Sequence, residues 1–187
     1  MPALTPSQTI GPFLRIQVPY EGEERMVAEN DPDAIHIRGT VYDGEGEIVD
    51  DALVEIWQAN RVGRYAHPED NREELPLEEG FTGFGRCATD SEGRFEFITV
   101  KPGRVPARGG GLQAPHIDVS VFARGLLKRL VTRIYFPDEA EANAEDPVLS
   151  SIEHPKERDT LVAIPQEGGL RFDIHLQGDG ETAFFVV

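Results

Sequence analysis

The stretch KPGRVPARGGGLQAPHIDVSVFARGLLKRLVTRIYF, residues 101–136, predicts the central strands of this chain. A loop rich in proline and glycine leads into the alternating run 117–123. The turn Arg124-Gly125 follows, and a second apolar run spans 130–136. Short runs with a period of two between turn residues are typical of β-strands. The segment therefore predicts two neighbouring strands joined by a turn.

Polar residues and an unusual charge mark the same segment. In a strand, alternate side chains share a face, so His116 and Asp118 lie together, opposite the apolar residues between them. The segment carries seven basic residues and a single acid, Asp118, inside a chain of net charge −16. A local cationic field in an acidic protein favours an anionic ligand.

Further strand and helix patterns extend this picture over the whole chain. Additional strands are expected at residues 35–42, 52–57, 94–100, 170–176 and 182–187. The first two of these flank an Asp-Gly turn and are expected to form a hairpin.

Helix patterns are few, and either of two segments, 138–152 and 155–162, could hold a short helix. We therefore predict an all-β fold, a β-sandwich of mostly antiparallel strands with one or two short helices. Residues 1–187 form one domain in this prediction, and residues 1–34 form an extended N-terminal arm that packs on a partner chain.

Composition excludes several classes of protein. The acid excess argues against nucleic acid and anionic membrane surfaces as partners. No apolar run approaches the ~20 residues of a membrane span, and the N-terminus lacks the pattern of a signal peptide. Cys87 is the sole cysteine, so no intrachain disulfide can form, and we expect a cytoplasmic location.

A family resemblance covers nearly the whole chain. It rests on these segments, found in order: TPSQTIGPF, VYDGEG, EIWQANRVGRY, GFGRCATDSEGRFEFITVKPG, APHIDVSVFARG, TRIYF and RFDIHLQGDGETAFF. The chain resembles the intradiol ring-cleaving dioxygenases, and within them the alpha chains of members built from two homologous chains. The resemblance implies a homologous beta chain as partner and a higher-order αβ oligomer. It also implies Fe(III) held by the beta chain, with 3,4-dihydroxybenzoate and O2 as substrates and 3-carboxy-cis,cis-muconate as product.

The resemblance also implies that this chain's own iron site is vestigial. The catalytic chain of the family holds iron with two Tyr and two His. Tyr65 matches the first Tyr and His116 the first His, whereas Val105 and Asp118 stand at the other two positions, and Gln113 replaces an Arg. Ferric iron needs hard anionic and imidazole donors, so an apolar Val105 removes a required ligand. We therefore expect no catalytic residue and no metal in this chain.

A role in the partner's substrate pocket is expected instead. By the resemblance, Gly11, Pro12 and Phe13 line the pocket from the N-terminal arm, and Arg133 approaches the substrate carboxylate. A guanidinium suits a carboxylate because it donates two parallel hydrogen bonds. Arg133 could alternatively pair with an Asp or Glu of its own chain.

Two other functions remain open from sequence. The chain could be a stand-alone iron dioxygenase that uses Tyr65, His116 and Asp118, because carboxylates also bind iron. It could also be a non-enzymatic β-sandwich that serves as a binding or scaffold protein.

Overall fold

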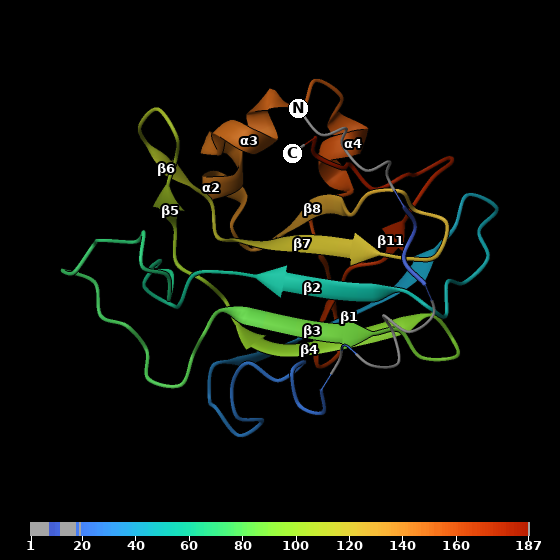
Figure 1. Ribbon diagram of the computed structural model, residues 1–187. Coiled ribbons are helices and arrows are strands. Elements are labelled where there is room, and N and C mark those ends of the chain that lie inside the picture. Colours follow the sequence, from blue (N-terminus) through green and yellow to red (C-terminus); the bar gives the residue numbers. More distant parts are fainter. Residues whose placement is uncertain (1–7, 12–17, 19, 187) are drawn as a thin grey trace, which may run out of the picture.

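Two facing sheets form the body of the protein, described by the computed structural model for residues 8–11, 18 and 20–186 (Figure 1). One sheet has four strands in a fully antiparallel order. In spatial order they are β3 (Phe84–Ala88), β2 (Leu53–Trp57), β7 (His116–Phe122) and β8 (Leu130–Tyr135). The two strands predicted from residues 117–123 and 130–136 are thus confirmed as the neighbours β7 and β8.

The second sheet is built around β1 and has five strands. Its members are β1 (Ala34–Tyr42), β4 (Arg94–Val100), β9 (Ile164–Gln166), β10 (Gly169–Arg171) and β11 (Ile174–His175). β4 runs antiparallel to β1, whereas β10 and β11 lie parallel to it. The prediction of a mostly antiparallel all-β fold is therefore confirmed.

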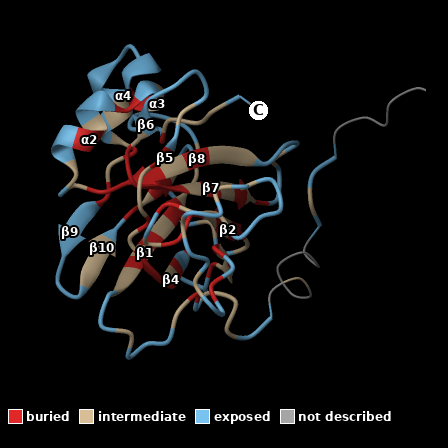
Figure 2. Cartoon of the chain, turned by 90° about the vertical axis from the view of Figure 1, so that its left-hand side faces the viewer, coloured by how far each residue is buried: buried red, intermediate tan, exposed pale blue. Residues whose placement is uncertain are grey.

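The main core lies between the two sheets, as the burial pattern in Figure 2 shows. Ile117, Val119 and Val121 of β7 are buried, and they face Ile37 and Phe97 of the other sheet's strands. Burying a large apolar side chain contributes about 1.5–3 kcal/mol. This burial fixes which face of β7 turns inward, and so it sends Asp118 to the outer face.

Three short helices lie next to β8, where 138–152 and 155–162 were expected to hold one or two (Figure 1). They are α2 (Ala140–Glu145), α3 (Pro147–Ser151) and α4 (Pro155–Asp159). The first predicted segment divides because Asp146 caps a new helix whose first residue is Pro147. A second small core of Tyr135, Leu149 and Leu161 lies among these elements.

Several strand predictions were wrong in their partners or extents. The expected hairpin of residues 35–42 and 52–57 does not form, because β1 and β2 belong to different sheets. The run 170–176 is split into β10 and β11. Residues 182–186 contribute only an isolated bridge, between Phe185 and Val131.

Residues 20–34 of the predicted N-terminal arm contact their own chain. Met26 is buried in the main core, and its amide donates to the Ile98 carbonyl at 2.8 Å. Arg25 forms a parallel bridge with Ile98, and residue 34 already belongs to β1. Packing of the arm, residues 1–34, on a partner chain stays a prediction. Within the described residues, no helix has the length and apolar character needed to cross a bilayer.

Candidate functional site

Three of the predicted site residues, His116, Asp118 and Arg133, lie together on the outer face of the four-stranded sheet. In the strand register, Trp57 of β2 is opposite Asp118 of β7, and Asp118 is opposite Arg133 of β8. His116 lies one step along the same face and is opposite Tyr135. Cross-strand neighbours on one face have Cβ atoms about 4.5–5.5 Å apart, so the sheet itself brings these side chains together.

Tyr65 reaches this face from the loop after β2, and that loop is tightly packed. The amides of Gly63 and Gly103 both donate to the Asn60 carbonyl, each at 2.9 Å. A Cβ on Gly103 would lie 2.5 Å from the Gly63 nitrogen, so the two turns meet without room for side chains. The Tyr65 ring then stacks on Trp57, with centroids 5.9 Å apart.

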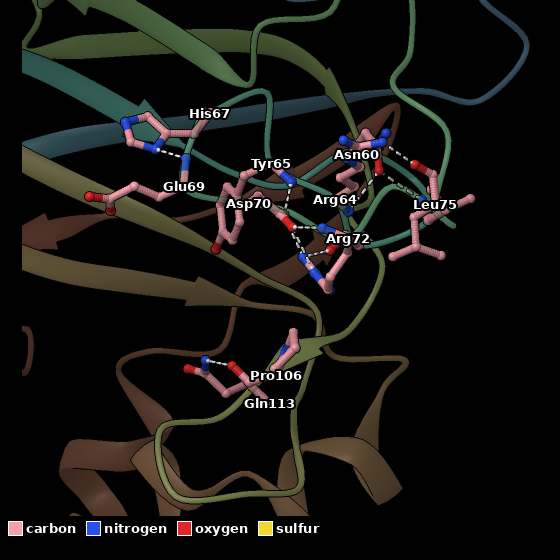
Figure 3. Close-up of polar contacts among 12 residues, drawn as sticks. Asn60, Arg64, Tyr65, His67, Glu69, Asp70, Arg72, Leu75, Pro106 and Gln113 are labelled. Carbon is pink, nitrogen blue, oxygen red and sulfur yellow. Dashed lines mark hydrogen bonds and ion pairs between the residues drawn. The ribbon is translucent and has the colours of Figure 1, made fainter.

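An ion pair fixes the backbone at Tyr65, as Figure 3 shows. Asp70 accepts a hydrogen bond from the Tyr65 amide at 2.8 Å and from Arg72 Nε at 2.8 Å. The Arg72 guanidinium holds the pKa of Asp70 well below its usual range. Burial, reinforced by the charge of Asp118, raises the pKa of the Tyr65 phenol to about 12. Tyr65 is therefore a neutral phenol at physiological pH.

His116 is buried and has one free ring nitrogen. Its Nδ1 lies 2.8 Å from the Ala114 carbonyl oxygen, so Nδ1 carries the hydrogen and donates. Its Nε2 is buried without a hydrogen-bond partner and lies 4.0 Å from Asp118 Oδ2. Burial, together with the nearby charge of Arg133, lowers the pKa of His116.

Arg133 is engaged by groups of its own chain. Its Nε donates to Asp118 Oδ1 at 2.8 Å, and its Nη1 donates to Gln113 Oε1 at 2.7 Å. A weaker contact of 3.3 Å joins Nη1 to the Tyr135 hydroxyl. The side chain is 18% exposed. The geometry favours the alternative that sequence left open, in which Arg133 pairs with an acid of its own chain.

The network continues to Asp146, which sequence reasoning missed. This fully buried carboxylate accepts from the Ala114 amide at 2.7 Å and from the Tyr135 hydroxyl at 3.3 Å. It also caps α3 through the amides of Val148 and Leu149. The dipeptide Asp146-Pro147 was the signal available in the sequence, because a capping Asp before Pro marks a helix start.

A cleft of about 590 Å3 opens beside this face. Trp57, Tyr65, Val105 and Gln113 are among the residues that line it. Val105 is buried, and it pairs with Gln113 between the two-residue strands β5 (Val105–Pro106) and β6 (Leu112–Gln113). The fold therefore gathers Tyr65, Val105, His116 and Asp118 at one end of the sheet.

These residues do not fit ferric iron. Val105 offers no donor atom, and Asp118 is already bound to a guanidinium. In the described part of the chain, no three His, Cys, Asp or Glu side chains gather as a metal site would require. A hard cation needs anionic donors, and a fixed positive charge at one of them opposes its binding.

Gly11 and Arg133, the two described residues that are expected to bind substrate, are not brought together within the chain. Gly11 is exposed, and Thr9 Oγ1 accepts a hydrogen bond of 2.7 Å from the Gly125 amide. Gly125 follows the end of β7, whereas Arg133 pairs near its beginning (Figure 1). Arg124 precedes Gly125 in the chain, and its side chain is 72% exposed and pairs with Asp51. Pro12 and Phe13 lie outside the described residues.

The sequence matches a known family and known proteins over most of its length. A family model described as Dioxygenase matches residues 18–178. The protocatechuate 3,4-dioxygenase alpha chain of Pseudomonas putida is 43% identical over 197 residues, which cover 97% of this chain and 95% of that one. The protocatechuate 3,4-dioxygenase beta chain of Burkholderia cepacia is 39% identical over 158 residues, covering 79% and 66%.

A solved structure agrees on the fold. The dioxygenase domain of a carbohydrate-binding fusion protein from Streptomyces sp. SirexAA-E superposes with a TM-score of 0.59 at 22% identity. It covers 94% of this chain and 100% of that one. By its sequence and its family match, the chain belongs to the intradiol dioxygenase family, as a homologue of protocatechuate 3,4-dioxygenase alpha chains.

Proposed function

We propose that this chain is the alpha subunit of a protocatechuate 3,4-dioxygenase. The observation that carries the proposal is the 43% identity to an alpha chain over 97% of this chain and 95% of the relative. The assembled enzyme would cleave 3,4-dihydroxybenzoate between its two hydroxyls with O2 and yield 3-carboxy-cis,cis-muconate. The whole of 1–187 would act as one domain within an αβ oligomer, in the cytoplasm.

The iron of the assembled enzyme belongs to the homologous beta chain in this proposal. The family uses iron, and both alpha and beta chains occur among the relatives. The side chains at Tyr65, Val105, His116 and Asp118 support placing the iron in the beta chain. Val105 offers no donor atom, and the charge of Asp118 is neutralised by Arg133. The same geometry disfavours a stand-alone iron dioxygenase.

This chain's contribution would be part of the wall of the partner's substrate pocket. Gly11 is exposed, and apart from its chain neighbours no described residue has an atom within 4 Å of the position of a Cβ there, so its backbone can be approached closely. Pro12 and Phe13 stay predicted members of this wall. Holding the substrate in one orientation itself contributes to rate.

Arg133 and Arg124 are the two candidates for binding the substrate carboxylate, and assays of the assembled enzyme distinguish them. The assignment to Arg133 stays a prediction, and it requires the guanidinium to exchange Asp118 for the substrate. Arg124, next to Gly125 in the chain, is 72% exposed, but it too pairs with an acid of its own chain, Asp51, at 3.1 Å. A charge-assisted hydrogen bond contributes about 1.5–3 kcal/mol, so losing the correct guanidinium raises KM by roughly 10–100-fold.

Co-expression with a candidate beta chain tests the function directly. Ring cleavage is followed by O2 uptake for each chain alone and for the mixture, and we expect activity only from the mixture. Arg124→Ala and Arg133→Ala are then compared within the complex, with the exposed Lys128→Ala as a basic control. Equal KM values in all three variants would remove both arginines from the pocket. Failure to form a complex with any iron-bearing homologue would favour the scaffold alternative.

A further inference from the structure

We propose that Arg133 is the resident cation of the Tyr65–His116–Asp118 cluster and that it excludes a metal ion from this site. The guanidinium neutralises Asp118, as a bound metal would. If the missing ligands were the only obstacle, restoring donors at Val105 and Asp118 would create an iron site. With Arg133 as the resident cation, restoring these donors will not create an iron site while Arg133 is present.

The backbone fixes Arg133 in this position. Asp118 and Arg133 are direct partners in the β7–β8 register, so their side chains start from neighbouring points on one face. The Nε–Oδ1 distance is 2.8 Å, and Gln113 Oε1 holds Nη1 at 2.7 Å. The phenyl ring of Phe185 lies 6.0 Å from the guanidinium carbon and covers it on one side. The cation is thus contacted from several directions.

His116 presents an acceptor nitrogen to this cluster. Its Nδ1 donates to the Ala114 carbonyl, which leaves Nε2 as an acceptor. That Nε2 is buried, has no partner among the described residues, and lies 4.0 Å from Asp118 Oδ2. Buried polar atoms are nearly always hydrogen-bonded, so an unpaired one requires an explanation. Our proposal supplies this explanation: Nε2 of His116 is the remnant of a metal ligand, and Arg133 has taken the place of the metal.

Electrostatics sets the size of the expected effect. Metal–ligand bonds are about 2 Å long, so an ion bound to a donor at position 118, directly opposite Arg133 in the strand register, would lie within about 5 Å of the guanidinium. At an effective dielectric constant of about 20, repulsion between unit charges at this distance weakens binding by at least roughly a hundredfold. A trivalent ion is opposed more strongly. One fixed cation is therefore enough to exclude a metal from an otherwise restored site.

Redesign of the site tests the inference. Three variants are compared: Val105→Tyr with Asp118→His; the same pair with Arg133→Gln; and the same pair with Arg86→Gln. Arg86 pairs with Glu55 on the same sheet face, at 2.7 Å, and is the matched control. Each variant is incubated with ferric iron and desalted. Iron per chain and the visible absorption of a tyrosinate–iron complex are then measured.

We expect retained iron and colour only in the variant that lacks Arg133, with affinity at least a hundredfold above the other two. Equal iron binding by the double variant would overturn the proposal. So would an absence of iron from the folded Arg133→Gln triple variant. Circular dichroism establishes that each variant is folded.

A second measurement covers the case in which the larger tyrosine at buried Val105 prevents folding. Asp118→Asn, Arg133→Gln and their combination form a double-mutant cycle read by thermal unfolding. If Arg133 neutralises Asp118, Arg133→Gln alone lowers the Tm more than the combined change does, because it leaves the carboxylate unpaired. Strictly additive changes in Tm would contradict the proposal.

Discussion

Replacement of Asp146 by Ala tests how the helices are tied to the site. The carboxylate is fully buried and accepts hydrogen bonds from the Ala114, Val148 and Leu149 amides at 2.7, 2.8 and 3.0 Å. Loss of the helix cap costs about 1 kcal/mol. Leaving the buried Ala114 amide unpaired costs about 1–3 kcal/mol more. We therefore expect a loss of about 2–4 kcal/mol in the free energy of unfolding.

For a chain of this length, that loss lowers the Tm by about 4–16 °C. Thermal and urea unfolding of the purified variant measure it, with the exposed Asp159→Ala as a control from the same helical region. Hydrogen exchange should quicken at the Ala114 and Leu149 amides in particular. The reasoning fails if Asp146→Ala is no less stable than Asp159→Ala, or if exchange at the Ala114 amide is unchanged.

Three further predictions follow from the packing. Gly103→Ala forces a methyl group against the Gly63 nitrogen and should destabilise the chain by about 1–3 kcal/mol in urea unfolding; wild-type stability would show that the two turns can separate freely. Met26→Ala should cost about 2–5 kcal/mol without any partner present, because Met26 lies in this chain's own core; a loss seen only in the complex would place residues 20–34 on the partner instead. The pKa of Tyr65 rises from an unfolded value of about 10 to about 12, so its contribution to stability is complete below pH 10 and lost as pH rises through 12. Tyr65→Phe should remove that part of the alkaline loss in pH-dependent unfolding, and an unchanged alkaline profile would show that Tyr65 titrates normally.

Local alternation was enough to predict the strands that carry the site. The apolar residues 117, 119 and 121 recur with a period of two, and the main core buries all three. The outward direction of Asp118 follows from the same period. β3 escaped prediction because Gly85 interrupts its pattern; a Cβ there would lie only 3.0 Å from the Met26 sulfur, so close packing selects glycine.

Long-range pairing was the part that sequence could not supply. The turn after β1 does fold back, with Asp43 N donating to the Glu47 carbonyl at 2.9 Å, but the returning segment is too short to pair β1 with β2. The run 170–176 follows β1 in parallel, through Phe172 N to the Arg38 carbonyl, and breaks into two short strands. Such pairings depend on the whole sheet and leave no local signal.

The residues of the candidate site were likewise predictable from sequence, whereas their pairing was not. Tyr65, Val105, His116 and Asp118 could be named from motifs, and the fold brings them to one end of a sheet. The partner of Arg133 depends on the β7–β8 register, which the seven-residue connection between the strands does not fix from sequence. The structure supplies that register and places Arg133 against Asp118 at 2.8 Å.

Iron analysis of separated chains tests the central claim most directly. The complex with a beta chain is purified, its two chains are resolved, and iron is measured in each and in this chain expressed alone. We predict that all stoichiometric iron accompanies the beta chain, and that this chain alone is colourless and free of iron. Stoichiometric ferric iron with tyrosinate colour in the chain expressed alone would contradict the account.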